Sequence, residues 1–214
     1  MSIKIKICGV KEQENIECCI ENKVNMIGFV FHNDSPRNIS IKNASNLVKL
    51  YKNHIEIVGL VVDPSDDLLD QIIDKVGICK IQFHGNESPE RIFYIKERYN
   101  ISSIKAIPVF HNLSALEIDP YHEASDYILF DTPPISSANR PGGNGVAFDW
   151  HLVQKLNIIK PWILSGGLKI ENVKEAISIT KANFVDVSSG VEESLGIKNN
   201  DLITKFVYNA RHSE

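Results

Sequence analysis

Short apolar runs rich in β-branched residues recur along the whole chain. Eight of them have the length of a strand: residues 3–7, 26–31, 55–62, 79–83, 104–109, 127–130, 162–164 and 184–187. The segments between them space their apolar residues as on one face of a helix, as Ile16, Cys19 and Ile20 do. This alternation of strand and helix predicts a parallel sheet.

The number of units decides between the two common parallel folds. Eight strand–helix units within 214 residues, 43% of them hydrophobic, match a small (β/α)8 barrel, whereas a doubly wound sheet usually has fewer strands. Cys8-Gly9-Val10-Lys11 after the first strand also lacks the glycine spacing of a dinucleotide-binding turn. We therefore expect residues 1–214 to form a single TIM-barrel domain of the α/β class.

Composition indicates which partners and which cellular location to expect for the protein. With 23 basic and 27 acidic side chains, the net charge of -4 argues against a nucleic-acid partner bound through a broad positive face. No stretch resembles a signal peptide or approaches the roughly 20 apolar residues of a membrane span. The four cysteines lack the spacing of a zinc site or disulfide framework, which favours a reducing, cytoplasmic location. Cys18 and Cys19, in a predicted helix, and Cys79, in a predicted strand, are interpreted as packing residues.

Polar residues follow the predicted strands and would meet at one mouth of a barrel. They are Cys8, residues 32–37, Asp63, His84, Asp131, residues 165–167 and residues 188–190. Cys8 and Asp131 could serve as a base and an acid on opposite sides of a substrate. The simpler alternatives are that Cys8 is a small buried apolar residue and that Asp131 only ends its strand with an Asx-turn.

Two glycine-containing loops point to a phosphorylated small-molecule substrate. Ser165-Gly166-Gly167 follows the seventh strand and Ser188-Ser189-Gly190 follows the eighth, the two loops that commonly form a barrel's phosphate site. Glycines let backbone N–H groups approach the anion, and a short helix terminus would add its dipole. Either loop alone could simply turn the chain.

Two further side chains are candidates for contacting substrate. The planar guanidinium of Arg37, after the second strand, could hold a carboxylate through two hydrogen bonds, although a lone arginine is more often a surface charge. His84 could contact substrate or be a hydrogen-bonded structural histidine. Since neither metal-ligand spacing nor a nucleotide-binding loop is evident, we expect chemistry without a cofactor. The connection at 131–148 is long for a compact barrel, and loops of this length are usually functional.

Taken together, six motifs resemble the phosphoribosylanthranilate isomerase family of tryptophan biosynthesis. They are Lys6-Ile7-Cys8-Gly9, residues 28–31 with Ser35-Pro36-Arg37, Gln82-Phe83-His84-Gly85, residues 142–145 with 148–150, Ser165-Gly166-Gly167-Leu168 and residues 186–192. Each motif is weak alone, but all six occur in order from the first strand to the last. Asn144 stands where the family usually has threonine.

The resemblance implies a (β/α)8 barrel that catalyses an Amadori rearrangement without metal or organic cofactor. N-(5-phosphoribosyl)anthranilate would become 1-(2-carboxyphenylamino)-1-deoxyribulose 5-phosphate, with Asp131 as general acid and Cys8 as general base. Arg37 would hold the anthranilate carboxylate. The backbones of Gly166, Gly167, Ser189 and Gly190 would hold the phosphate, and Asp186 would contact a ribose hydroxyl.

Two other functions remain open from the sequence. A different phosphosugar barrel, such as an indole-glycerol-phosphate synthase or a histidine-pathway isomerase, would share the phosphate loops. The synthase needs a lysine acid at a strand end, whereas Lys6 and Lys80 fall within predicted strands. A non-catalytic barrel that binds phosphorylated metabolites is the second alternative. The sequence is compatible with a monomer or a homodimer.

Overall fold

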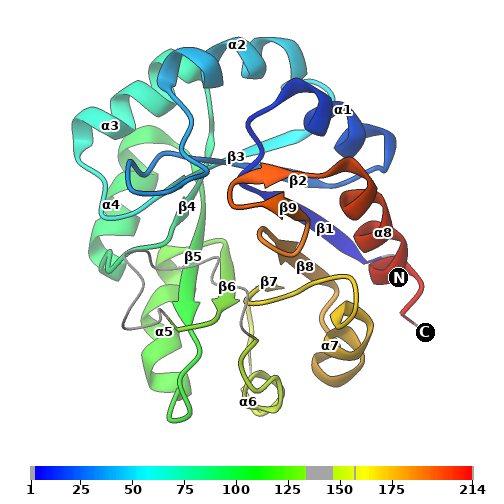
Figure 1. Ribbon diagram of the computed structural model, residues 1–214. Coiled ribbons are helices and arrows are strands. Elements are labelled where there is room, and N and C mark those ends of the chain that lie inside the picture. The colour runs from blue at the N-terminus through cyan, green and yellow to red at the C-terminus, as the bar shows by residue number, and fades with distance from the viewer. Residues whose placement is uncertain (1–2, 134–146, 157, 214) are drawn as a thin grey trace.

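The computed structural model describes residues 3–133, 147–156 and 158–213 and contains a closed barrel of eight parallel strands in sequence order. Figure 1 shows the barrel with its helices arranged around the outside. The strands are β1 (Lys4–Cys8), β2 (Met26–Val30), β3 (Glu56–Val61), β4 (Lys80–Phe83), β5 (Ser102–Pro108), β6 (Tyr127–Asp131), β7 (Trp162–Leu164) and β8 (Phe184–Val187). The predicted (β/α)8 barrel is confirmed, and each strand matches its predicted run to within two residues.

Helices follow the strands in turn. They are α1 (Gln13–Glu21), α2 (Ile41–Tyr51), α3 (Asp66–Asp70) continued by the π-helix η1 (Gln71–Val76), α4 (Pro89–Tyr99), α5 (Ala115–Ala124), α6 (His151–Gln154), α7 (Val173–Thr180) and α8 (Asn200–Arg211). Several begin with a side-chain cap: Ser40, Ser65 and Ser88 each accept a hydrogen bond from the backbone N–H three residues on. No helix of the described residues is both long and apolar enough to cross a bilayer.

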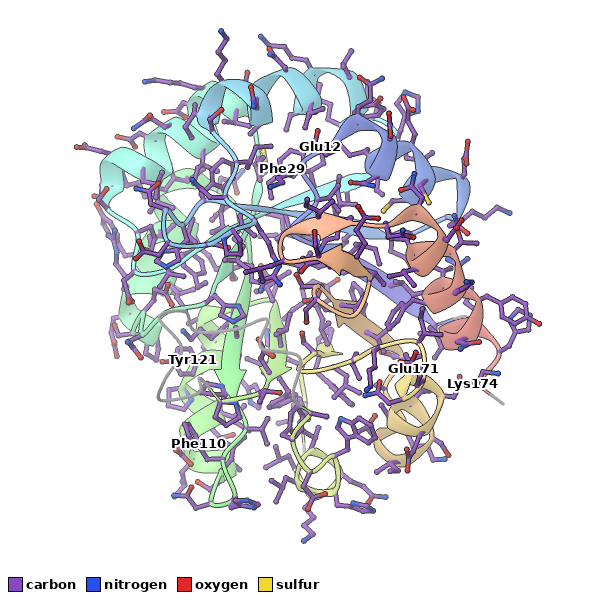
Figure 2. The ribbon with its side chains drawn as sticks, viewed as in Figure 1. Glu12, Phe29, Phe110, Tyr121, Glu171 and Lys174 are labelled. Carbon is purple, nitrogen blue, oxygen red and sulfur yellow. The ribbon has the colours of Figure 1, made fainter. Side chains whose placement is uncertain are left out.

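Strand side chains alternate between two layers. On β2, Ile27 and Phe29 face the helices and belong to the large core cluster between barrel and helices; Phe29, labelled in Figure 2, is fully buried. Met26 instead faces the barrel interior, where it packs in a second cluster with Val58, Ile104, Ala106, Leu129, Ile163 and Phe184. Apolar side chains thus fill both layers, which is why the strands read as continuous apolar runs.

Several inward-facing residues toward the carboxyl ends of the strands are polar instead. Four of these polar residues are buried, and each lies at a strand position that faces the barrel interior: Lys6, Gln82, Asp131 and Asp186. The apolar interior therefore supports a polar layer at one mouth of the barrel, the mouth at which the sequence predicted the site.

Two local predictions are wrong. Cys79 is exposed and precedes β4 by one residue, because the strand begins at Lys80; Cys18 and Cys19 are buried on α1 as expected. After β8 the chain forms a hairpin of β9 (Glu192–Ser194) and β10 (Ile197–Lys198) in place of the short helix expected there. Gly196 at its turn has a φ of 81°, a conformation that favours a tight turn over a continuing helix.

Candidate functional site

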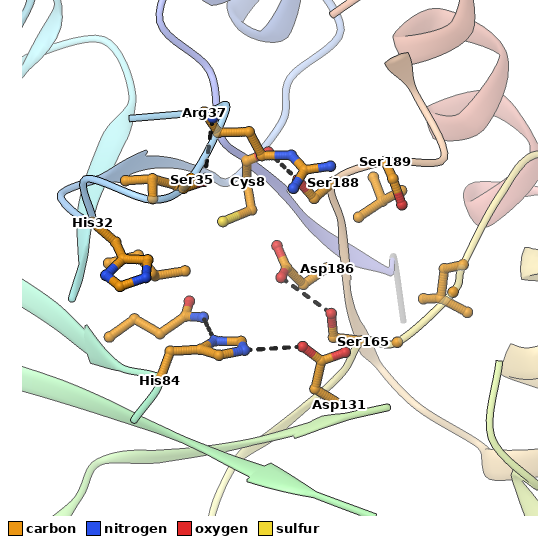
Figure 3. Close-up of a pocket in the computed structure, with 17 residues that line it drawn as sticks. Cys8, His32, Ser35, Arg37, His84, Asp131, Ser165, Asp186, Ser188 and Ser189 are labelled. Carbon is orange, nitrogen blue, oxygen red and sulfur yellow. Dashed lines mark hydrogen bonds and ion pairs between the residues drawn. The ribbon is translucent and has the colours of Figure 1, made fainter. Parts of the chain in front are cut away.

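A pocket opens at the carboxyl ends of the strands, in the polar layer of the barrel (Figure 3). Of the nine candidate catalytic and substrate-binding residues, eight line this pocket: Cys8, Arg37, His84, Asp131, Gly166, Gly167, Asp186 and Ser189. Val30 and Leu60 add an apolar wall. The structure thus brings together side chains from strands and loops spread from one end of the chain to the other.

Cys8 is the last residue of β1, and its side chain points into the pocket (Figure 3). The next residue, Gly9, has a φ of 79°. The strand therefore ends in a left-handed backbone conformation, which glycine adopts more readily than other residues. The backbone oxygen of Cys8 accepts a hydrogen bond of 2.9 Å from the Ser188 hydroxyl. Burial raises the pKa of the thiol, and the charge of Lys6 opposes that effect.

Lys6 and Asp186 form a buried ion pair beneath the pocket. Lys6 Nζ lies 3.0 Å from Asp186 Oδ1, and Asp186 Oδ2 accepts a hydrogen bond from the Ser165 hydroxyl. Sequence reasoning placed Lys6 within a strand and gave it no role. Its spacing two residues before Cys8, on the same face of β1, is the signal that could have shown it.

Asp131 is held by a chain of side chains from β4, drawn in Figure 3. His84 Nε2 lies 3.1 Å from Asp131 Oδ2, and Gln82 Nε2 lies 3.0 Å from His84 Nδ1. With the Gln82 amide in this orientation its nitrogen donates to Nδ1, which matches the His84 tautomer that carries its proton on Nε2, toward Asp131. Asp131 Oδ1 accepts a further hydrogen bond from the backbone N–H of Thr132.

Arg37 is buried and already engaged by a carboxylate of the protein. Its Nε and Nη2 donate to the two oxygens of Glu192 at 2.7 and 2.9 Å, and Lys198 Nζ lies 2.8 Å from the same carboxylate. Burial works against the charge of Glu192, but Arg37 and Lys198 outweigh it and lower the pKa of Glu192 to about 2. Sequence reasoning assigned no role to Glu192 or Lys198, since nothing local in the hairpin connects them to Arg37.

The two glycine loops lie side by side at one wall of the pocket. Gly166 and Gly167 both have positive φ, and a side chain on Gly166 would collide with the backbone of Thr132. Gly190 does not line the pocket: a β-carbon there would lie 2.0 Å from the backbone oxygen of Leu168. Gly190 thus lets the two loops pack against each other, while Gly166, Gly167 and Ser189 face the cavity.

Asp63, expected at the mouth, is turned away from this pocket. Its Oδ1 accepts the backbone N–H of Asn86, so it fastens one loop to the next. Glu87, which sequence reasoning missed, lies in the same region and accepts hydrogen bonds from the backbone of Gly85 and from Lys105 Nζ. This buried pair fixes the loop that follows His84. The motif at residues 142–145, including Asn144, lies outside the described residues.

Comparisons with known proteins cover almost the whole chain. A family model described as "N-(5'phosphoribosyl)anthranilate (PRA) isomerase" matches residues 5–209. N-(5'-phosphoribosyl)anthranilate isomerase of Rhodopseudomonas palustris strain TIE-1 is 43% identical over 211 residues, which are 99% of each chain. The relative of the same name from Parvibaculum lavamentivorans is 41% identical over the full length of both chains.

Solved structures give the same result. Phosphoribosyl anthranilate isomerase from Thermotoga maritima superposes with a TM-score of 0.85 at 33% identity, covering 97% of this chain and 98% of that one. A second structure of such an isomerase, in complex with reduced 1-(o-carboxyphenylamino)-1-deoxyribulose 5-phosphate, has a TM-score of 0.81 at 32% identity and the same coverage.

Proposed function

Because this chain belongs to the N-(5'-phosphoribosyl)anthranilate isomerase family, we propose that Asp131 and Cys8 are the acid and the base of its reaction. The protein is an enzyme of tryptophan biosynthesis, and its reaction is the Amadori rearrangement of N-(5-phosphoribosyl)anthranilate to 1-(2-carboxyphenylamino)-1-deoxyribulose 5-phosphate. The observation that carries the assignment of roles is that Asp131 and Cys8 face one pocket from opposite walls.

Ring opening is the first step and needs an acid. Asp131 gives a proton to the furanose ring oxygen, the bond between that oxygen and carbon one breaks, and the anthranilate nitrogen supplies the electron pair that forms an iminium. His84 holds the carboxyl in place through Oδ2.

Proton removal from carbon two is the second step. The iminium acidifies this C–H bond, so the Cys8 thiolate takes the proton and the electron pair moves into the bond between carbons one and two. The resulting enolamine gains a proton at carbon one and loses the hydroxyl proton at carbon two, which gives the ketone. The substrate thus gains one proton from Asp131 and gives one proton to Cys8, so its total number of protons is unchanged.

The two ends of the substrate bind at separate places in this proposal. Glu192 uses Nε and Nη2 of Arg37, so the remaining N–H groups of the guanidinium, including Nη1, can donate to the anthranilate carboxylate. The backbones of Gly166, Gly167 and Ser189 receive the phosphate, with Gly190 keeping the two loops in contact. Fixing both ends holds carbons one and two between Asp131 and Cys8.

Asp186 is already paired within the protein, in addition to the ribose contact that the family resemblance implies. One of its carboxylate oxygens faces Lys6 and the other faces Ser165. Since Asp186 also lines the pocket, a ribose hydroxyl could add a hydrogen bond to this carboxylate without breaking the ion pair. We infer that Asp186 contacts the ribose while it stays paired.

The domain organisation, location and oligomeric state of the enzyme are a further part of this proposal. A related solved structure is described as mutually generated monomers of the dimeric isomerase from Thermotoga maritima, so both states exist among such proteins. We infer that residues 1–214 form one domain that acts in the cytoplasm as a monomer or homodimer on its small phosphorylated substrate. Sedimentation of the purified chain distinguishes the two states.

The test is a fluorescence assay with freshly prepared N-(5-phosphoribosyl)anthranilate and the purified chain. We expect the anthranilate fluorescence of the substrate to fall as it is isomerised, and mass spectrometry to find a product of unchanged mass. Loss of carbon dioxide from that product would indicate a synthase activity instead. Binding without any change in the substrate would support a non-catalytic barrel and overturn the proposal.

A further inference from the structure

Lys6 has no exposed surface, although lysine normally keeps its ammonium group in water. It lies on β1 with the same inward phase as Cys8, two residues further along, and the ammonium pairs with Asp186. Such a buried pair is on average no more stabilising than apolar residues of the same volume. Stability alone therefore gives no reason for a charge at this position.

The ammonium and the thiol share one space inside the barrel. Gly28 on β2 pairs with Cys8 in the sheet, and a β-carbon added to Gly28 would lie 2.9 Å from Cys8 Sγ and 3.4 Å from Lys6 Nζ. Cys8 Sγ and Lys6 Nζ therefore both border the space that a side chain at residue 28 would fill. Because Gly28 has no side chain, nothing from this residue stands between the ammonium of Lys6 and the sulfur of Cys8.

We propose that Lys6 is a positioning residue whose ammonium stabilises the Cys8 thiolate, while Asp186 keeps that ammonium charged. The inference rests on the proposed function of Cys8 as the general base. A thiolate buried in low dielectric needs a nearby positive charge, and an ammonium below the sulfur supplies it without occupying the pocket. Asp186 pairs with the ammonium next to Cys8 and also lines the pocket in which the substrate would bind.

Four charged groups face Cys8 from the elements around it. Burial raises the pKa of the thiol most, Lys6 is the largest opposing influence, Asp186 on β8 raises the pKa, and Lys198 on β10 and Arg37 after β2 lower it. Burial also works against the charge of Lys6 itself, but Asp186 and Cys8 outweigh it and hold the pKa of Lys6 above its ordinary value. The neighbouring carboxylate of Asp186 thus favours the charged form of Lys6.

The other titratable residues that line the pocket are His32, His84 and Asp131. In Figure 3 His32 and His84 lie across the pocket from Ser188, and His84 is paired with Asp131. Lys6 forms its ion pair with Asp186, so we expect a substitution at Lys6 to leave these three side chains in place. A change in the titration of Cys8 in such a variant therefore reports the loss of the ammonium.

The experiment is peptide-resolved alkylation by iodoacetamide across a range of pH in the wild-type protein and Lys6→Met. Cys79 is exposed and serves as the internal standard. We expect the inflection of Cys8 to move up by at least about one pH unit, a loss of about tenfold in thiolate at neutral pH. The matched control is Lys105→Met, which breaks another buried pair, that with Glu87, and should leave Cys8 unchanged.

A folded Lys6→Met protein with an unchanged Cys8 inflection would overturn the inference, as would an equal shift in Lys105→Met. If Lys6→Met does not fold, 15N NMR of the wild-type Lys6 ammonium decides. Its chemical shift should change at the pH where Cys8 ionises, and this step should vanish in Cys8→Ser; a wild-type signal without the step overturns the inference. Turnover by Cys8→Ser would instead disprove the base assignment, and the alkylation profile does not depend on turnover.

Discussion

Glu192 holds Arg37 through two parallel hydrogen bonds, from Nε to Oε1 at 2.7 Å and from Nη2 to Oε2 at 2.9 Å. The pair joins residues that are 155 positions apart in the sequence, and both side chains are buried. Such two-point pairing fixes the plane of the guanidinium as well as its place. Arg37 is thus oriented before any substrate arrives.

Glu192→Gln should therefore weaken both the fold and substrate binding. Removing one charge of a buried pair leaves Arg37 partly unpaired, so we expect the free energy of unfolding at pH 7 to fall by about 3 kcal/mol. KM should rise more than kcat falls, because the carboxylate-binding group loses its orientation. Urea unfolding and steady-state kinetics measure the two effects, with Glu193→Gln, at the exposed neighbouring residue, as the control.

The same pair makes stability depend on pH. The pKa of Glu192 lies at about 2 in the folded protein, below its ordinary value of 4.5. The stabilisation is therefore complete above about pH 4.5 and is lost as pH falls toward 2. The difference in unfolding free energy between the wild-type protein and Glu192→Gln should shrink over this interval. A difference that stays constant from pH 7 to pH 3 would contradict the prediction.

Cys8→Ser and Asp131→Asn should each reduce kcat by at least about a hundredfold, since each removes one proton-transfer group. Circular dichroism and thermal melting should show that both variants remain folded, because neither side chain is enlarged. Near wild-type turnover in either variant would show that another group performs that step. Cys79→Ser, at an exposed cysteine outside the pocket, serves as the matched control for Cys8→Ser.

Gln82→Leu should lower activity with little effect on stability. Gln82 is fully buried, and its Oε1 has no hydrogen-bond partner among the described residues, so an apolar replacement removes an unsatisfied atom. It also removes the donor that fixes the tautomer of His84. We expect kcat to fall by about tenfold, the lower end of what losing an orienting partner of a functional histidine costs. 15N NMR of His84 should then show both tautomers; a single Nε2–H form would contradict this account.

Gly9→Ala should displace Arg37 in addition to straining the backbone. Gly9 has a φ of 79°, and an added β-carbon would lie 2.6 Å from Arg37 Cδ. Gly77 has a similar φ of 85° but nothing within 4 Å of that position, so Gly77→Ala shows the backbone cost alone. We expect both variants to lose about 1 kcal/mol of stability from the backbone and only Gly9→Ala to lose more and to raise KM. Equal effects on KM would argue against the contact.

The barrel could be predicted from sequence because its strands are buried on both faces and each appears as an apolar run. The same rule misplaced Cys79. An apolar residue at the start of such a run can be the first residue of the strand or the last residue before it, and the sequence does not distinguish the two. The pocket residues could be predicted where a motif marks a strand end, as for Cys8 and Asp131. Lys6 and Glu192 could not, because their partners Asp186 and Arg37 are 180 and 155 positions away.

Closure of the barrel has a consequence for biosynthesis of the chain. β1 pairs with β8 through four residue positions, from Lys4 with Phe184 to Ile7 with Val187. Lys6 meets Asp186 only through this pairing, so a nascent chain on the ribosome carries Cys8 long before the surroundings that define its chemistry exist. The first strand to be synthesised must wait for the last, and the reactive centre is assembled only when the ring of strands is complete.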